Sequence, residues 1–575
     1  MTSASWLLVP TEATAVFTPE QLTEEHHLIS RTAQDFVRQE VLPQLDALDA
    51  RDWTVARTLL RKCGTLGLLG VDVPEAFGGV DLDKVSSLLV AEAVAGNASF
   101  ATTFGAMTGL AIVPLLCFGT DDQRTRYLPR LVSGELVGAY ALSESGSGSD
   151  ALGARARATR TADGDFVLDG EKMWITNGGF ADIFIVFAKV DGEHFSAFIV
   201  ERGFAGVSTG QEEHKMGLHG SSTAPLVLQG VRVPAANLLG EVSRGHKVAF
   251  NVLNYGRFKL GAMCTGGAKT AMVDAAKYAA QRRQFGKAIA EFGAIRHKLG
   301  EMTARLYATE SLLYRLAGAI DGMADAGMLA ALEAYAVEAS IAKVAGSEML
   351  QYVLDENVQI HGGNGYVRDY PAERYYRDAR VNRIFEGTNE INRLLIPGML
   401  MRRALKGELA IIPAARALQD ELLSITSQDA SDDPLAQAGA IVTGMRKITL
   451  LTLGSAMQRF GEQIQEEQEV LMWAADLAIE TYAADSALAR ATQAVASGHR
   501  DADLHRRAAL VAVHGSAHRA ETTVREALPA VLEGDMLRTA LAGARRFLKV
   551  ASTNLVPLRR ALADAAVSAQ GHPFV

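Results

Sequence analysis

Residues 164–177, GDFVLDGEKMWITN, alternate apolar and polar side chains in the way that is typical of a half-buried β-strand. Three more short apolar runs follow, separated by Gly, Asp, Asn and Pro: ADIFIVFAKV (181–190), FSAFIVERG (195–203) and APLVLQGVRVP (224–234). Before and after this region, apolar residues recur at spacings of three and four, the period of an amphipathic helix. The sequence therefore predicts a mostly α-helical protein with an inserted β-domain.

The changes of pattern along the chain predict four units. An N-terminal helical domain covers residues 1–137, and a middle β-domain covers residues 138–248. A helical bundle covers residues 249–406, and an extra C-terminal helical domain covers residues 407–575. A chain of 575 residues with 48% hydrophobic residues is long enough to bury several cores.

Composition restricts the class of protein. The 57 Lys and Arg against 66 Asp and Glu give a formal net charge of −9, so no overall cationic field attracts nucleic acid. Cys63, Cys117 and Cys264 form no metal-ligand motif, and we expect no metal and a reducing, cytoplasmic compartment. The first residues lack the pattern of a secretory signal, and we expect no uncharged apolar run of the roughly 18 residues that suggest a membrane-spanning helix.

Four motifs carry residue types suited to a cofactor site. YALSESGSGSD (140–150) combines hydroxyls and glycines that can approach a phosphate or flavin, although a flexible turn explains it equally well. WITNGG (174–179) places an aromatic plane beside a hydroxyl, although a strand-end Trp in the core is commoner. QRRQFG (281–286) offers arginines and QIHGGNGYVRDYP (359–371) offers close glycines, and each is weak alone.

A fifth motif, RVNRIFEGTNEINRLLIPG (380–398), contains the strongest candidate for a general base. Glu386 lies between Phe385 and Gly387, just before a helix that Thr388 can cap. A carboxyl group in so apolar a setting is expected to have a pKa raised by burial, which suits a base near neutral pH. A solvated glutamate at a loop end is the competing interpretation.

The order of these five motifs in a helical, β, helical frame strongly resembles the acyl-CoA dehydrogenase family from about residue 22 to residue 401. The stretch NVLNYGRFKLG (251–261) and the C-terminal helical extension are similar to the very-long-chain subgroup. The resemblance implies an N-terminal helical domain, a β-barrel-like middle domain and a four-helix bundle. It also implies FAD-dependent conversion of long-chain fatty acyl-CoA to trans-2-enoyl-CoA in β-oxidation, an electron-transferring flavoprotein as electron acceptor, and a homodimer.

The resemblance assigns a role to each motif. Glu386 would remove the α-proton, and Ser149, Asn254, Arg257 and Gly387 would contact the acyl-CoA. Some relatives carry the base just before Arg257, where this chain has Gly256. Within one subunit, FAD would be contacted by Tyr140, Leu142, Ser143, Gly148, Ser149, Trp174, Thr176, Thr388 and Glu390. Across the dimer, the FAD of the partner subunit would be contacted by Arg282, Phe285, Gln359, Gly362 and Gly363.

Several alternatives remain open at this point. An acyl-CoA oxidase or a flavin monooxygenase on the same fold would pass electrons to oxygen, and a non-catalytic assembly or scaffold relative would keep the fold alone. Gly105 and Gly109, one helical turn apart, are expected to keep the acyl pocket open to chains of roughly 12 carbons or more, unless they only let two helices approach. The apolar segment 440–464 is expected to be buried in a helical bundle, with weak peripheral docking at the inner face of the membrane as the alternative.

Overall fold

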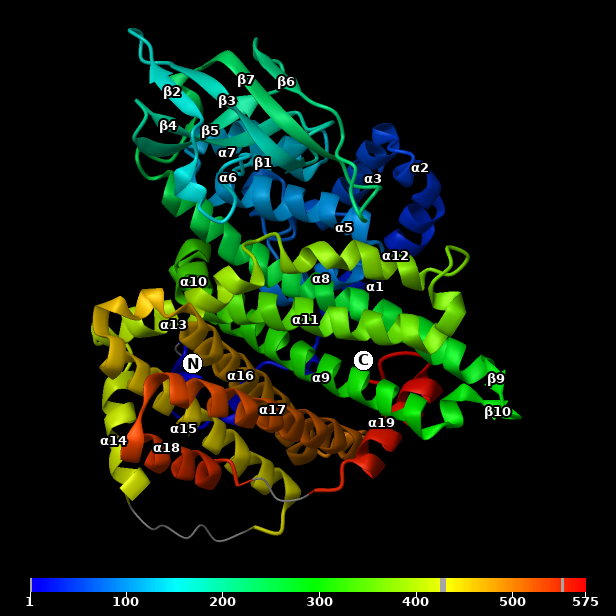
Figure 1. Ribbon diagram of the computed structural model, residues 1–575. Helices are drawn as coiled ribbons and strands as arrows, with labels where there is room; N and C mark the ends of the chain where they lie inside the picture. The colour runs from blue at the N-terminus through cyan, green and yellow to red at the C-terminus, as the bar shows by residue number, and fades with distance from the viewer. Residues whose placement is uncertain (1–2, 424–430, 550–552, 575) are drawn as a thin grey trace.

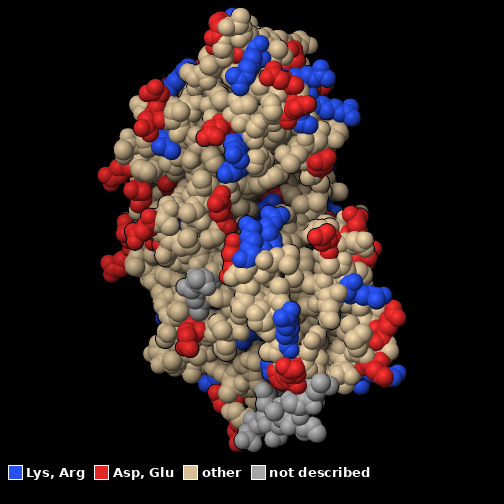
Figure 2. Space-filling view, turned by 90° about the vertical axis from the view of Figure 1, so that its left-hand side faces the viewer, with Lys and Arg blue, Asp and Glu red and all other residues tan. Residues whose placement is uncertain are grey.

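The computed structural model describes residues 3–423, 431–549 and 553–574. Figure 1 shows the β-domain at one end, a layer of long helices in the middle, and the helices of the C-terminal extension at the opposite end. Basic and acidic side chains are interspersed over the face in Figure 2. This is the helical, β, helical architecture with extra C-terminal helices that the sequence predicts.

The N-terminal region is built from short helices whose starts the sequence encodes. The side chains of Thr23, Asp83, Asn97 and Thr120 each accept a hydrogen bond from a backbone N–H of the first turn that follows. The helices are α1 (Glu24–Phe36), α2 (Leu45–Asp49), α3 (Trp53–Thr65), α4 (Lys84–Val94), α5 (Ala98–Gly105), α6 (Val113–Phe118) and α7 (Asp121–Val132).

Residues 98–118 form one continuous helical stretch, because α5 runs through a π-helical segment, Ala106–Ile112, into α6. The stretch contains no charged residue, so the expectation that no uncharged run would reach membrane-spanning length is wrong. By length and composition it could cross a membrane, yet 72% of its apolar window is buried inside the protein. Packing on nearly all sides accounts for its composition.

The β-domain is one eight-stranded sheet. Its order is β6-β7-β3-β2-β4-β5-β8, and β1 pairs in parallel with β4. The long strands β4 and β5 are buried along most of their length, which explains their continuous apolar runs. The strands are β1 (Gly138–Ala141), β2 (Arg157–Arg160), β3 (Phe166–Thr176), β4 (Ile183–Val190), β5 (His194–Glu201), β6 (Val207–Thr209), β7 (Thr223–Val233) and β8 (Leu238–Leu239).

The middle layer is a bundle around two long helices, α8 and α11, which pack against each other. Glycines bring their backbones together, because a Cβ added at Gly346 would lie 3.1 Å from the Cα of Gly261. A small hairpin, β9 (Arg283–Gln284) and β10 (Lys287–Ala288), follows α8. The helices are α8 (Gly245–Gln281), α9 (Gly293–Asp321), α10 (Met328–Ala334), α11 (Ala336–His361), α12 (Ala372–Ala379) and α13 (Asn389–Leu405).

The C-terminal extension packs on this bundle as a further layer of helices. A buried ion pair joins Arg490 of the extension to Glu310 of α9 at 2.6 Å, and another joins Asp485 to Arg315 at 2.8 Å. Most of the predicted apolar segment 440–464 lies in α15, and residues 441–456 are mostly buried, as expected for a bundle helix. The helices are α14 (Ile411–Leu423), α15 (Pro434–Phe460), α16 (Gln468–Ala496), α17 (Ala502–Val531), α18 (Gly534–Phe547) and α19 (Val556–Ala569).

Candidate active site

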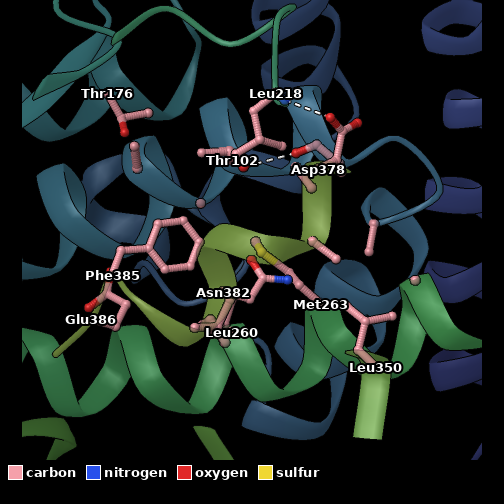
Figure 3. Close-up of a pocket in the computed structure, with 18 of the residues that line it drawn as sticks. Thr102, Thr176, Leu218, Leu260, Met263, Leu350, Asp378, Asn382, Phe385 and Glu386 are labelled. Atoms are coloured by element: carbon pink, nitrogen blue, oxygen red, sulfur yellow. Dashed lines mark hydrogen bonds between the residues drawn. The ribbon is translucent and has the colours of Figure 1, made fainter. Parts of the chain in front are cut away.

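A cavity lies between α5, its π-helical continuation, α8, α11 and α12. Most of its lining is small or apolar. In Figure 3, Glu386 and Thr176 lie on one side of the cavity and Leu350 lies on the other. The candidate base therefore lies at one end of a long apolar chamber.

The loop that carries Glu386 has an unusual backbone. Glu386 and Gly387 have φ angles of 59° and 75°, so two consecutive residues adopt the left-handed backbone conformation. Three side chains hold this loop by its carbonyl oxygens. Arg257 Nε donates to Glu386 O at 3.2 Å, Lys343 Nζ donates to Gly387 O at 2.8 Å, and Asn392 Nδ2 donates to Gly387 O at 2.9 Å. Donors from three helices thus stabilise a conformation that costs free energy on its own.

The carboxylate of Glu386 packs directly on α8. A Cβ added at Gly256 would lie 2.6 Å from Oε2, too close for any other residue to fit without moving the carboxylate. Oε2 itself is buried and accepts no hydrogen bond from the described residues. Glycine at 256, where some relatives carry their base, is here the residue that makes room for Glu386.

Burial raises the pKa of Glu386 to about 7, while the charges of Arg257 and Lys343 act in the opposite direction. The direction of this shift agrees with the expectation from its apolar neighbours, and the burial of Oε2 argues against a solvated glutamate. Burial also lowers the pKa of Arg257 to about 10 and that of Lys343 to about 8. Burial, together with the charge of Glu386, raises the pKa of Tyr140 well above its usual value, so this phenol stays neutral.

The backbone N–H of Glu386 is free to bind a ligand oxygen. The preceding N–H groups of Ile384 and Phe385 both donate to Val381 O, at 2.7 and 3.2 Å. The N–H of Glu386 finds no acceptor within the described part of the chain. A hydrogen-bond donor and a carboxylate of the same residue therefore border the cavity.

The loop at residues 143–150 is fixed by a buried ion pair behind it. Lys172 Nζ donates to Glu144 Oε1 at 2.7 Å and to Leu142 O at 3.1 Å. At Gly146 and Gly148 an added Cβ would meet nothing within 4 Å, so the front of the loop is open. A rigid loop thus exposes its backbone, as the flavin interpretation requires.

Trp174 lies beside this loop, because the N–H of Met173 donates to Ser143 O at 2.9 Å. A register shift in β3 between Lys172 and Ile175, with a φ of 57° at Trp174, leaves the indole 55% exposed. The competing interpretation of Trp174 as a core residue is therefore wrong. Of the predicted flavin residues, Ser143 thus lies beside the strand that carries Trp174 and Thr176, and Thr176 lines the cavity.

Other predicted site residues lie near the catalytic loop in α8 and at the start of α13. Arg257 Nη1 donates to Asn254 Oδ1 at 2.8 Å, so Asn254 orients the guanidinium that holds the loop. Thr388 caps α13 as predicted, since its hydroxyl accepts from the N–H of Ile391 at 3.2 Å. Glu390 is exposed in the first turn of α13.

A second group of predicted residues lies elsewhere in the chain. Arg282 directly follows α8 and Phe285 lies in the turn between β9 and β10, while Gln359 lies in the last turn of α11 and Gly362 and Gly363 follow that helix. The two helix ends adjoin, because the rings of Tyr278 and His361 stack at 4.1 Å. Along α8 this end lies about 38 Å from Gly256, at 1.5 Å per residue. Within one chain, these five residues therefore lie far from Glu386.

Sequence reasoning missed the residues that hold the site from behind, namely Lys343, Asn392, Glu144 and Lys172. Lys343 is the single lysine of α11 and lies in the apolar stretch SIAKVAG, where a charged side chain signals a buried partner. Asn392 and Lys172 gave no comparable signal. Within the described ranges, no group of three His, Cys, Asp or Glu residues could hold a metal ion.

Family models match most of the chain. The acyl-CoA dehydrogenase N-terminal domain matches residues 23–135, the middle domain matches residues 139–231, and two C-terminal domain models match residues 243–400 and 444–546. A probable acyl-CoA dehydrogenase of Bacillus subtilis (strain 168) is 45% identical over 557 residues, which are 95% of this chain and 94% of that protein. The human mitochondrial very long-chain specific acyl-CoA dehydrogenase is 36% identical over 76% of this chain and 70% of its own.

Solved structures of acyl-CoA dehydrogenases are also similar to this chain. A crystal structure of acyl-CoA dehydrogenase complexed with FAD from Bacillus anthracis matches with a TM-score of 0.97 at 44% identity, and all of both chains is covered. Butyryl-CoA dehydrogenase from Megasphaera elsdenii matches with a TM-score of 0.62 at 37% identity, covering 66% of this chain and 99% of its own.

Proposed function

Because the chain belongs to the acyl-CoA dehydrogenase family and its cofactor is FAD, we propose that it oxidises long-chain fatty acyl-CoA to trans-2-enoyl-CoA with Glu386 as the base. The observation that carries this proposal is the buried carboxylate of Glu386, with a pKa raised to about 7, at one end of an apolar cavity. A base with this pKa accepts a proton near neutral pH. The proposed pathway is fatty acid β-oxidation.

The residues around the cavity fit a flavin. The backbone at Gly146 and Gly148 is open, Trp174 is exposed and Thr176 lines the cavity, and each of these groups suits contact with a flavin. We assign the ring of FAD to these groups, together with Tyr140, Leu142, Ser143, Ser149, Thr388 and Glu390. FAD, when bound, supplies the acceptor for the β-hydride.

Two groups of Glu386 act on the substrate in this proposal: its carboxylate accepts the α-proton, and its backbone N–H stabilises the charge that develops on the thioester oxygen. Oε2 of Glu386 accepts no hydrogen bond from the described part of the chain, so no donor there competes with the α-proton for it. The unpaired N–H of Glu386 is the donor for the thioester oxygen, which gains negative charge as the proton leaves. Arg257 and Lys343 use their donors on loop carbonyls, so they orient the base instead of binding the reacting atoms.

The length of the cavity supports long acyl chains. Its lining follows α8 from Gly256 to Thr270, about 21 Å at 1.5 Å per residue. An extended hydrocarbon chain advances about 1.25 Å per carbon, so this length holds about 16 carbons. Gly105 and Gly109 both line the cavity, and a Cβ at Gly109 would meet nothing closer than Tyr255 at 3.8 Å. Gly109 thus leaves open space and is not needed for close helix contact.

The separation of the two groups of predicted residues supports a homodimer. Phe285 is 94% exposed beyond the far end of α8, and Gly362 and Gly363, just after α11, have open backbones. We assign Arg282, Phe285, Gln359, Gly362 and Gly363 to the FAD of a second subunit. The exposed phenylalanine is then covered by the assembly instead of by water.

The electron acceptor and the location are parts of the same proposal. We assign an electron-transferring flavoprotein as the acceptor, and we place the enzyme in the cytoplasm, with at most weak peripheral attachment to the membrane. Burial of α15 in the bundle favours weak attachment, since this helix has little apolar surface left to insert.

An anaerobic titration tests the proposed reaction. The FAD-loaded protein is mixed with acyl-CoAs from butanoyl-CoA to eicosanoyl-CoA, and bleaching of the flavin is followed. We expect bleaching with long chains, and we expect Glu386→Gln to bind them without bleaching. Absence of bleaching with every acyl-CoA would contradict the proposal, and rapid oxygen consumption by the reduced protein would favour an oxidase.

A further inference from the structure

A guanidinium joins the C-terminal extension to the helix that follows the catalytic loop. Asp476 on α16 accepts a hydrogen bond from Arg393 Nε on α13 at 2.7 Å. The two terminal nitrogens of Arg393 bind both carboxylate oxygens of Glu348 on α11, at 2.7 and 3.0 Å. One side chain thus holds α16, α13 and α11 together with a planar, two-pronged geometry.

The same network continues inward from Glu348 to the loop. Asn389 Nδ2 donates to Glu348 Oε1 at 3.0 Å, and Asn389 Oδ1 accepts from Lys343 Nζ at 2.6 Å. Lys343 Nζ also donates to Gly387 O at 2.8 Å. Asn389 and Lys343 are buried, so each of these bonds lies in a medium where an unmade bond is costly.

The neighbours of each residue in this hydrogen-bond network fix which of its atoms donate and which accept. Asn389 must present its oxygen to Lys343, because its nitrogen is taken by Glu348. Glu348 is held in place by Nη1 and Nη2 of Arg393, whose Nε donates to Asp476. A weaker acceptor at Asp476 therefore loosens the carboxylate that orients Asn389.

We propose that Asp476 is a positioning residue for the catalytic loop. Acting through Arg393, Glu348, Asn389 and Lys343, it fixes the left-handed backbone at Glu386 and Gly387 and keeps the carboxylate of Glu386 away from water. The extension then contributes to the orientation of the base as well as to the assembly of the helical layers. This inference rests on the proposed role of Glu386 only for its kinetic test.

Loss of the Asp476 charge has a defined consequence. The loop relaxes, water reaches Glu386, and its pKa falls from about 7 toward that of a solvated carboxyl. We expect kcat to fall about tenfold with KM within about twofold, because the base is misplaced after the substrate has bound. The acidic limb of the kcat profile should move to lower pH by about one unit.

The experiment compares full-length, FAD-loaded Asp476→Asn with wild type. Two quantities are measured: the pH profile of kcat, and hydrogen–deuterium exchange of the peptide covering residues 384–392. The matched control is Arg559→Ala, which removes another partly buried ion pair between the extension and the bundle, with Glu301 of α9. Asp476→Asn should shift the profile and speed exchange in this peptide, whereas Arg559→Ala should do neither.

Further variants keep the inference falsifiable. Asp476→Glu restores the charge and should restore the wild-type profile. If Asp476→Asn does not fold with FAD, Arg393→Lys takes its place, since lysine keeps the charge but cannot make two parallel bonds to Glu348. Unchanged exchange and an unchanged profile would overturn the inference, as would the same changes in Arg559→Ala. If wild type shows no flavin reduction with any acyl-CoA, the proposed function fails, and the exchange comparison still decides the inference.

Discussion

Replacing Glu386 by Gln is expected to abolish turnover and to stabilise the fold at alkaline pH. The amide keeps the shape of the side chain but cannot accept the α-proton, so kcat should fall by about 10⁴. The effect on stability has a separate cause. Wild type must keep a charged carboxylate in a buried site above neutral pH, and the amide is never charged.

The size of the stability effect follows from the pKa of Glu386. Burial raises this pKa from 4.5 to about 7, so the carboxyl group favours the folded state while it is protonated. Its contribution is fully present below pH 4.5 and is lost as pH rises through about 7. The free energy of unfolding of the Gln variant should therefore exceed that of wild type by about 3 kcal/mol at about pH 8, and by less than about 1 kcal/mol at about pH 5.

Unfolding of the FAD-loaded proteins in urea, followed from about pH 5 to about pH 9, measures this difference. Glu241→Gln, which removes an exposed carboxylate in the loop before α8, is the matched control and should unfold with the same free energy as wild type. The assignment of a buried carboxylate with a raised pKa would be refuted if Glu386→Gln and wild type had equal free energies of unfolding at about pH 8, or if their difference were as large at about pH 5.

Three further variants test the cavity and the extension. Gly256→Ala should retain FAD and lower the rate of flavin reduction by about 100-fold, because the added Cβ would lie 2.6 Å from the catalytic carboxylate. Gly109→Phe should remain soluble and shift the preferred substrate to shorter acyl chains, measured as kcat/KM against chain length; equal loss for all lengths would contradict this. Truncation after Met401 removes Asp485 and Arg490, which form buried ion pairs with Arg315 and Glu310, and should give aggregates in gel filtration. A soluble truncated dimer would argue against a structural role for the extension.

The arrangement of helical and β regions could be predicted because each has its own period of apolar residues. The runs 181–190 and 195–203 became β4 and β5, and the helix starts followed from capping side chains. The same reasoning failed at residues 98–118. Their uncharged composition reflects packing on nearly all sides of one core helix, a property that depends on neighbours far away in the sequence.

Part of the site could also be predicted from sequence. Glu386 was visible through its apolar neighbours and Thr388 through its position before a helix, and both predictions concern local chemistry. The support for the loop was not visible. Lys343 and Arg257 reach the loop from α11 and α8, and the bonds to its carbonyls form only when these helices pack. Long-range partners of this kind have no local sequence pattern.

The placement of the two cations explains how Glu386 can be both buried and basic. Arg257 and Lys343 lie close enough to lower its pKa, yet both donate to carbonyl oxygens of the loop and neither donates to the carboxylate. A direct bond from either cation would favour the charged form and bring the pKa below the neutral range, which would weaken the base. The unpaired Oε2 is therefore a requirement of the chemistry, and its cost is offset by the bonds that hold the backbone of the same residue.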